Sequence, residues 1–306
     1  MNPMKVMPNT DRVPEDITYR SSDEILAHPG FAKARKIFIE AILGLYEHEP
    51  FLNRLLLEAG RHVIFSVIMC LDANYDEADR TTWSTMSRLK QAMTQFGLAS
   101  PRRVEAIVAR LVQVGYVELV ESRLDGRVRL LVPTAKMLAQ DQDWLAAHYL
   151  PLHVLFPIPG YAPAVNKDPS FQRTQRLVAM NFFGRGAQIL SSNPDMMLFL
   201  SRDAGVMVLI KLLQRLCDDG TGQSGGLSYA DIGMRFGVSR THVRGILQDA
   251  ARAGLVSLSD RGGKLVQLQP PILRAFDRFI ADSMSGHDLL FQIAGGETAC
   301  AKREAS

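Results

Sequence analysis

Apolar residues recur three or four positions apart through much of the chain, a spacing typical of amphipathic helices. The segment Phe31–Ile42 shows this spacing clearly. Two strongly apolar segments, 63–71 and 206–213, predict helices buried in a core. Short alternating runs at Leu255–Leu258 and Leu265–Leu268 predict strands. The pattern therefore predicts a mainly α-helical fold with small β-hairpins, of the α+β class.

Several short motifs occur twice in the same order, which indicates an internal repeat. His28-Pro29-Gly30-Phe31 recurs as Asp168-Pro169-Ser170-Phe171, 140 residues later. The other repeated pairs are Glu58-Ala59-Gly60 with Asp203-Ala204-Gly205, Phe96-Gly97-Leu98 with Phe236-Gly237-Val238, Ser100, Val104 and Ile107 with Ser239, Val243 and Ile246, and Gly115-Tyr116-Val117 with Gly254-Leu255-Val256. We expect two homologous units at residues 21–150 and 170–294, a proline-rich linker at 151–169, and disordered tails at 1–20 and 295–306.

The second unit contains the pattern of a helix-turn-helix. Segments Tyr229–Phe236 and Arg240–Ala253 predict two short helices, with Gly237 in the turn and Ser239 as the N-cap of the second helix. Gly233 supplies a small residue where the two helices must touch. Two helices joined by a short glycine turn form this motif.

A hairpin follows the helix-turn-helix in the second unit. Strands are predicted at 255–258 and 265–268, around the polar turn 260–264, and a helix from Ile272 to about Met284 closes the unit. A helix-turn-helix followed by a hairpin is the winged-helix arrangement.

The first unit repeats this arrangement with changes. Its second helix starts after Ser100, and Pro101 occupies the first helical position, which favours proline. Its hairpin is predicted at Val117–Glu121 and Val128–Val132, with Asp125-Gly126 as the turn signal. Met93 stands where the second unit has a glycine, so we expect a less regular helix-turn-helix here.

These motifs resemble those of bacterial winged-helix transcription regulators. The segment Ser239–Arg244 is similar to the recognition helix of GntR-type and Crp-type regulators, and Asp125-Gly126-Arg127 resembles the D-x-R wing of MarR-type regulators. That resemblance implies that Arg127 reaches the DNA backbone or minor groove and that Asp125 orients it. MarR-type proteins are ordinarily dimers of chains about half this length. The resemblance therefore implies two fused repeats that form a single-chain pseudo-dimer.

DNA-binding residues are predicted on both recognition helices and both wings. In the second unit they are Ser239, Arg240, Thr241, His242, Arg244, Gln248, Arg261 and Lys264. In the first unit they are Ser100, Arg102, Arg103, Arg123, Arg127 and Arg129. Arginine can bind guanine and glutamine can bind adenine through paired hydrogen bonds. Glu105 is acidic where Arg244 is basic, so we expect an asymmetric site with half-sites about one helical turn apart.

Charge supports a polyanionic partner. The 306 residues carry a net charge of only +3, but residues 86–136 hold nine basic and four acidic side chains, and residues 227–278 hold eight and four. The rest of the chain therefore has a net charge of −6. Positive charge concentrated in two windows suggests a polyanionic partner, and the winged-helix resemblance implies that this partner is double-stranded DNA.

Other classes of protein find little support in the sequence. The three cysteines are scattered, no apolar stretch reaches the roughly 18 residues of a membrane span, and no secretory signal begins the chain. We therefore expect a cytoplasmic protein. No P-loop, G-x-S-x-G or H-E-x-x-H motif occurs, so we expect no enzyme, no cofactor and no metal site.

Two alternatives stay open at this point. Plasmid replication initiators also carry two winged helices in one chain, and some winged-helix units serve as protein–protein interaction modules. A small-molecule effector is a further expected partner, between the upstream helices and the DNA-binding parts, although no set of residues identifies it.

Overall fold

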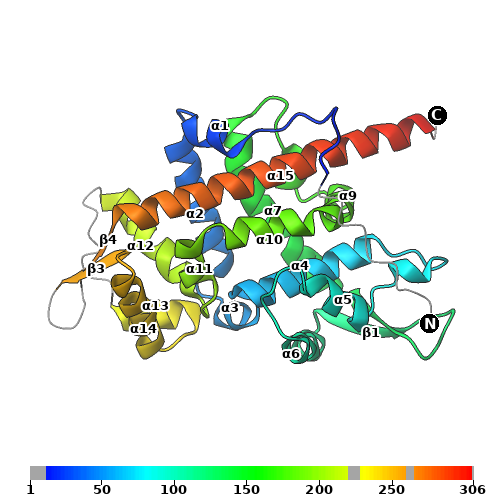
Figure 1. The fold of residues 1–306 in the computed structure, drawn as a ribbon, viewed down its shortest axis with the longest axis horizontal. Coiled ribbons are helices and arrows are strands. Elements are labelled where there is room, and N and C mark those ends of the chain that lie inside the picture. The colour runs from blue at the N-terminus through cyan, green and yellow to red at the C-terminus, as the bar shows by residue number, and fades with distance from the viewer. Residues whose placement is uncertain (1–11, 220–227, 260–264, 305–306) are drawn as a thin grey trace.

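The computed structural model describes residues 12–219, 228–259 and 265–304, and most of them are helical (Figure 1). The first half contains α1 (Ser22–Ala27), α2 (Phe31–Tyr46), α3 (Pro50–Leu56), α4 (Ala59–Ala73), η1 (Arg80–Thr82), α5 (Met86–Met93), α6 (Pro101–Gln113), β1 (Val117–Glu121), β2 (Arg129–Pro133) and α7 (Ala135–Leu155). The rest contains α8 (Ala162–Val165), α9 (Pro169–Ala179), η2 (Met180–Phe182), α10 (Phe183–Ser191), α11 (Pro194–Leu200), α12 (Gly205–Asp219), α13 (Tyr229–Phe236), α14 (Arg240–Arg252), β3 (Val256–Ser259), β4 (Leu265–Leu268) and α15 (Pro270–Glu304). The predicted α+β class is confirmed, because the strands form two antiparallel hairpins, β1 with β2 and β3 with β4.

Two groups of elements follow the predicted helix-turn-helix and hairpin order. We call α5, α6, β1 and β2 (residues 86–133) head one, and α13, α14, β3 and β4 (residues 229–268) head two. In head two, a Cβ added to Gly233 would lie 2.5 Å from the carbonyl oxygen of Val238, so only glycine fits where the helix meets the turn. Met93 is buried at the corresponding place in head one, where α5 ends earlier and the connection to Ser100 is longer.

The repeated sequence motifs have matching local hydrogen bonds. Gly115 and Gly254 both adopt left-handed backbones, with φ of 74° and 73°, and each ends a predicted recognition helix. The residues that follow them make equivalent bonds of 2.9 Å, from Tyr116 N–H to the Leu111 carbonyl and from Leu255 N–H to the Ala250 carbonyl. The same sequence signals therefore produce the same backbone geometry twice.

Helices of the two halves pack against each other in a reciprocal way. Helix α2 of the first half contacts α12 of the second, and α9 of the second half contacts α4 of the first. The long helices α7 and α15 also contact each other and cover α2 and α9, respectively. One hydrophobic core therefore extends through both halves, from Ile25 to Met284.

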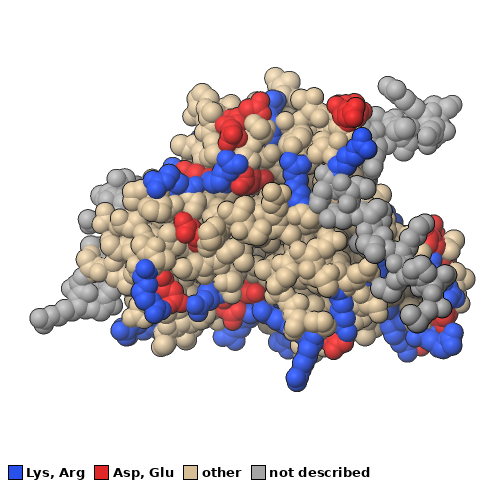
Figure 2. Space-filling view, in the orientation of Figure 1, with Lys and Arg blue, Asp and Glu red and all other residues tan. Residues whose placement is uncertain are grey.

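Both heads lie along one long edge of the molecule. In Figure 1, α13 and α14 lie at the lower left, α6 at the lower centre, and β1 at the lower right. Figure 2 shows that Lys and Arg side chains gather along this edge, with a few acidic ones among them. We call it the basic edge, and it includes the exposed Arg54, Arg102, Arg240 and Arg244.

The structure differs from the expected boundaries in three places. Helix α7 continues through Pro151, which lies inside the expected linker, because proline removes only one hydrogen bond of a well-packed helix. Helix α15 runs to Glu304, far beyond Met284 and into the expected C-terminal tail. Near the N-terminus, Arg20 N–H donates to Asp288 at 2.6 Å, and Ile17 packs against a small apolar cluster. Residues 1–11 lie outside the described part of the chain.

A buried ion pair joins the two halves. The Asp141 carboxylate of α7 accepts two hydrogen bonds from the Arg176 guanidinium of α9, at 3.0 and 2.5 Å, and one from Gln172 at 2.8 Å. Asp141 and Arg176 are almost fully buried. Burial of a charge is tolerated only when it is paired in this way.

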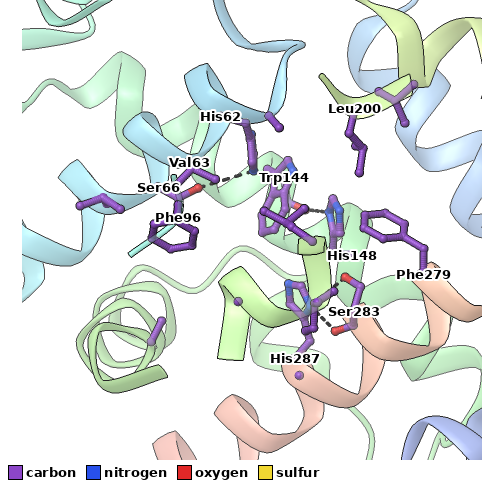
Figure 3. Close-up of a pocket in the computed structure, with 18 of the residues that line it drawn as sticks. His62, Val63, Ser66, Phe96, Trp144, His148, Leu200, Phe279, Ser283 and His287 are labelled. Atoms are coloured by element: carbon purple, nitrogen blue, oxygen red, sulfur yellow. Dashed lines mark hydrogen bonds between the residues drawn. The ribbon is translucent and has the colours of Figure 1, made fainter. Parts of the chain in front are cut away.

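A cluster of histidines and aromatic rings surrounds a cavity near this ion pair (Figure 3). His148 stacks on Trp144 with ring centroids 3.7 Å apart, and His287 stacks on His148 at 5.4 Å. His62 lies 4.9 Å from Trp144 on the other side. Desolvation lowers the pKa of His62 and of His287 to about 4 and holds that of His148 well below its ordinary value.

Across the described residues, no helix combines the length and apolar character that crossing a membrane requires.

Gly233→Ala should destabilise the protein by about 1–3 kcal/mol, because the added methyl group meets the backbone of the turn. The matched control is Gly245→Ala on α14, where a Cβ would meet nothing within 4 Å. That change should stabilise by about 0.5–1 kcal/mol, because alanine is the better helix former. Urea unfolding measures both, and equal effects would contradict the close approach at Gly233.

The histidine cluster should make stability fall with acid. Each ring has a folded-state pKa below its ordinary value, so the unfolded chain takes up protons first as the pH drops. The free energy of unfolding should be highest above pH 6.5 and should fall towards pH 4, by up to about 3 kcal/mol for one histidine. In His62→Gln the fall measured by urea unfolding should be smaller. An identical pH profile in this variant would contradict a buried neutral His62.

Candidate nucleic-acid interface

Helix α14 presents its predicted reading residues to solvent. Arg240, Thr241, Arg244 and Gln248 are all exposed. The opposite face is buried in head two through Val243, Ile246, Leu247 and Ala250. This division follows from the helical period, since positions one and five of the helix share a side. The N-terminal half of α14 therefore carries two arginines on an open surface.

Neither of these arginines forms an ion pair or a hydrogen bond with a described residue. The contrast is clear on the same helix, where Arg252 binds Asp249 and that carboxylate also binds Arg202. A guanidinium without a protein partner keeps all five of its donors for a ligand. Arg240 and Arg244 are thus available to phosphates or base edges.

His242 has a different position from the other predicted readers. Its Nε2 lies 2.9 Å from the carbonyl oxygen of Asp203. A carbonyl only accepts, so Nε2 donates and the ring is directed towards the protein. Ser239 caps the helix and its hydroxyl accepts from His242 N–H at 3.1 Å. His242 therefore positions α14, and nothing in its geometry favours base contact.

On α6 the predicted arginines also differ from one another. Arg102 is exposed and makes no ion pair with a described residue. Arg103 donates to the Glu58 carboxylate at 2.7 Å. Glu105 binds Lys90 of α5, so this acidic side chain is neutralised within head one. Ser100 caps the helix as predicted, and its hydroxyl accepts from Arg103 N–H at 3.3 Å.

The first hairpin contains the expected aspartate–arginine pair. Arg127 donates from Nε to Asp125 at 3.1 Å, and its backbone N–H donates to the same oxygen at 3.2 Å. These bonds hold the pKa of Asp125 below its ordinary value. The Arg127 side chain is 92% exposed, so it is oriented by Asp125 and still open to solvent.

The other predicted wing residues divide into three cases. Arg123 is exposed, and Arg129 binds Glu121 across the hairpin. Arg261 and Lys264 lie outside the described residues.

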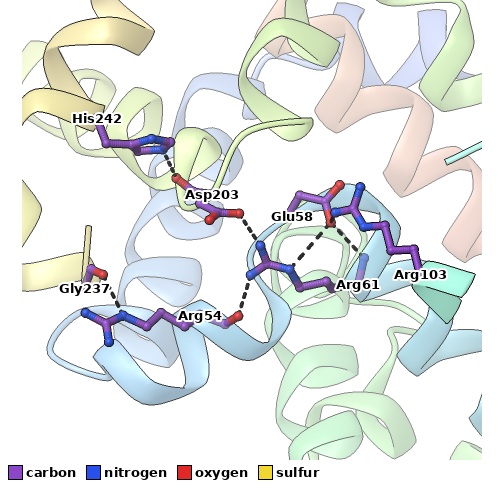
Figure 4. A network of polar contacts seen from close by, with 7 residues as sticks. All are labelled: Arg54, Glu58, Arg61, Arg103, Asp203, Gly237 and His242. Atoms are coloured by element: carbon purple, nitrogen blue, oxygen red, sulfur yellow. Dashed lines mark hydrogen bonds and ion pairs between the residues drawn. The ribbon is translucent and has the colours of Figure 1, made fainter. Parts of the chain in front are cut away.

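A polar network links the two heads beneath the basic edge (Figure 4). Arg61 at the start of α4 donates to Asp203, which precedes α12, and its Nε lies 3.8 Å from Glu58. The Glu58 carboxylate also accepts a hydrogen bond from Arg103 of head one. The backbone carbonyl of Asp203 accepts one from His242 of head two. We call Glu58, Arg61, Arg103, Asp203 and His242 the head-linking network. It connects the two predicted recognition helices through side chains of both halves.

The two ends of this network are equivalent in the repeat. Arg103 and His242 both lie three residues after the N-cap serine, and their partners Glu58 and Asp203 belong to one repeated motif. Arg61 breaks the equivalence, since the second half has Val206 in its place. A single arginine therefore joins two otherwise corresponding contacts.

Comparison of the chain with protein-family models, with curated proteins and with solved structures gives no match. The exposed helix faces, the unpaired arginines and the basic edge are therefore the observations on which a function can be proposed. No cluster of three or more metal-binding side chains occurs among the described residues.

The sequence pointed to Glu58 and Asp203 as members of a repeated motif but gave no sign of their role. Arg54 and Arg61 were missed as well. Arg54 lies on α3 at the basic edge and donates from Nε to the Gly237 carbonyl at 2.9 Å. The repeat alone could have suggested that Glu58 and Asp203 meet equivalent residues, whereas Arg61 could be found only from the structure.

Glu58→Gln should lower the free energy of unfolding by about 1–3 kcal/mol, because it removes the carboxylate that binds Arg103 and lies beside Arg61, at a buried position. Asp203→Asn is the matched control at the exposed end of the network, where a side chain 52% exposed should contribute less than about 1 kcal/mol. Urea unfolding of both variants measures the difference. A larger loss in Asp203→Asn would contradict the assignment of Glu58 as the buried centre.

Proposed function

We propose that the protein is a sequence-specific double-stranded-DNA-binding transcription regulator, built as a tandem winged-helix pseudo-dimer. The observation that carries the proposal is the open face of α14, where Arg240 and Arg244 form no ion pair or hydrogen bond with a described residue, on the same edge as α6. The matching hydrogen bonds and reciprocal packing of the two halves support the pseudo-dimer.

Head two is the stronger candidate reader. In a helix-turn-helix the N-terminal half of the second helix enters the major groove. Arg240 and Arg244 can each bind guanine O6 and N7, and Gln248 can bind adenine N6 and N7. The exposed Thr241 adds a hydroxyl for a base or a phosphate.

Phosphate contacts would position the heads without reading sequence. Ser100 and Ser239 place helix N-termini at the basic edge, and a helix N-terminus favours an anion. Arg127, held by Asp125, would reach the backbone or minor groove from the first wing.

The two heads should read different sequences. Arg102 is the arginine of α6 that stays open near its N-terminus, since Arg103 is held by Glu58 and Glu105 stands where head two has Arg244. We therefore propose a bipartite, asymmetric DNA site with half-sites about one helical turn apart. The head-linking network would set the separation of the two helices.

A protein-binding role for head one is the second candidate, favoured by one specific observation. Leu119, Val120 and Leu124 of its hairpin are exposed by 50%, 42% and 55%. Large apolar side chains left exposed on a surface element can mark a protein contact. In that case DNA binding would depend on head two alone.

Replacing Arg240 and Arg244 together by alanine should weaken binding to the preferred duplex by about 1–3 kcal/mol for each lost base contact. Arg252→Ala is the matched control, because Arg252 lies on the same helix and is paired with Asp249. Fluorescence anisotropy titration of a labelled duplex gives the affinities. Equal losses in the double variant and the control would exclude α14 as the reading helix.

Arg127→Ala should weaken binding to all duplexes similarly and lower the dependence of log affinity on log salt by about one. Arg173→Ala is the control, since this exposed arginine belongs to α9, which lies apart from α6 and α14 in Figure 1. Titrations at several salt concentrations measure the slope. A sequence-dependent loss at Arg127 would mean base readout and would overturn its assignment to the backbone.

A further inference from the structure

The cavity between the two halves has the size and lining of a small-molecule site. Its volume is about 330 Å³, roughly twice that of a cavity that holds one benzene ring. Helices α2, α4, α7, α9, α10, α12 and α15 all contribute to the wall. Apolar side chains make up most of it, and several of them are aromatic, among them Phe38, Phe96, Trp144, Phe276 and Phe279. Planar rings on the wall favour a flat aromatic occupant.

Two histidines present acceptors to this space. His148 Nδ1 lies 2.8 Å from the Trp144 carbonyl, and His287 Nδ1 lies 2.7 Å from the Ser283 carbonyl. A carbonyl only accepts, so in both rings Nδ1 carries the proton and Nε2 is the acceptor. Neither Nε2 has a hydrogen-bond partner among the described residues. Figure 3 labels both rings, His287 below His148 in the view.

A third acceptor on the wall is independent of the histidines. Gln175 lines the cavity and is 1% exposed, and its Oε1 has no hydrogen-bond partner within the described part of the chain. The Gln175 side chain also hydrogen-bonds Tyr149. Buried polar groups are nearly always paired, so an orphaned oxygen on a residue of the cavity wall points to a donor supplied by a ligand.

The charged side chains that border the cavity, Glu58, Arg176 and Arg185, are all bonded within the protein. Arg176 borders it, but its guanidinium is held by the Asp141 carboxylate. Arg185 also borders it, and its Nη2 donates to the Tyr19 hydroxyl at 2.7 Å. The nearby histidines are neutral at pH 7, because burial lowers their pKa values.

We infer that this cavity binds a neutral, planar aromatic molecule of two or three rings whose N–H or O–H groups donate to Gln175, His148 and His287. The ring system would lie among the aromatic side chains, and its donors would satisfy the acceptors. The cavity reaches Glu58 of the head-linking network but is lined by no residue of α6 or α14, and its occupancy is measured without DNA. Its test therefore stands apart from that of the proposed function.

A matched pair of probes tests the inference. Indole carries one N–H donor, and 1-benzothiophene has the same two-ring shape with sulfur in place of the N–H group. Titrations of the full chain, followed by ligand-observed NMR, should give an affinity for indole at least about ten-fold higher, which corresponds to one satisfied buried acceptor. Equal affinities, or tighter binding of the anionic 2-naphthoate than of indole, would overturn it.

Two variants locate the site. Gln175→Met removes the orphaned oxygen at similar volume and should reduce the preference for indole to about two- to three-fold. Gln140→Met is the control, because Gln140 also has a buried unpartnered atom but does not line the cavity. Gly186→Leu on α10 should fill the cavity and abolish binding, with the Tm showing that the variant is folded. An unchanged preference in Gln175→Met, or unchanged indole binding in a folded Gly186→Leu, would contradict the site.

Discussion

The reciprocal packing of helices between the two halves is the constraint on which the rest of the structure depends. Helix α2 is covered by α12, and α9 is covered by α4, so neither half buries its own apolar faces alone. The buried pair of Asp141 and Arg176 adds a directional contact to this packing, because a charge at such a site requires its partner in register. Both heads are connected to these helices in the chain. Their common position on one edge therefore follows from the packing between the two halves.

The centre of the molecule combines this packing with polar groups that serve no obvious role in stability. Neutral histidines and the Gln175 oxygen lie where apolar side chains would pack at lower cost. A few polar groups on an otherwise apolar cavity wall are better suited to a ligand than to a core. The basic edge differs from it, since Arg240 and Arg244 carry charges that no described residue pairs. Two surfaces of different chemistry, one internal and one external, thus occur in one fold.

Local elements could be predicted from the sequence, because their signals are local. Tyr229–Phe236, Val117–Glu121 and Leu265–Leu268 were predicted with their observed bounds, from caps, glycine turns and alternation. The length of α15 was not predicted. Two adjacent glycines near residue 295 favoured a disordered tail, although good helix formers follow them. The roles of Arg103 and His242 were missed for a different reason. Their partners, Glu58 and Asp203, are about 40 residues away in the chain. The local pattern of the sequence does not indicate contacts between residues so far apart. The wing contacts of head two lie outside the described residues and stay predictions.

Selection from a random pool of double-stranded DNA tests the central claim most directly. The full chain would be incubated with the pool at about physiological salt, because nonspecific binding weakens steeply as salt rises. The account predicts enrichment of one motif with two dissimilar halves about one helical turn apart, protected by a single chain. No enrichment at all would contradict sequence-specific binding. A symmetric palindrome bound by one chain would contradict two heads of different specificity.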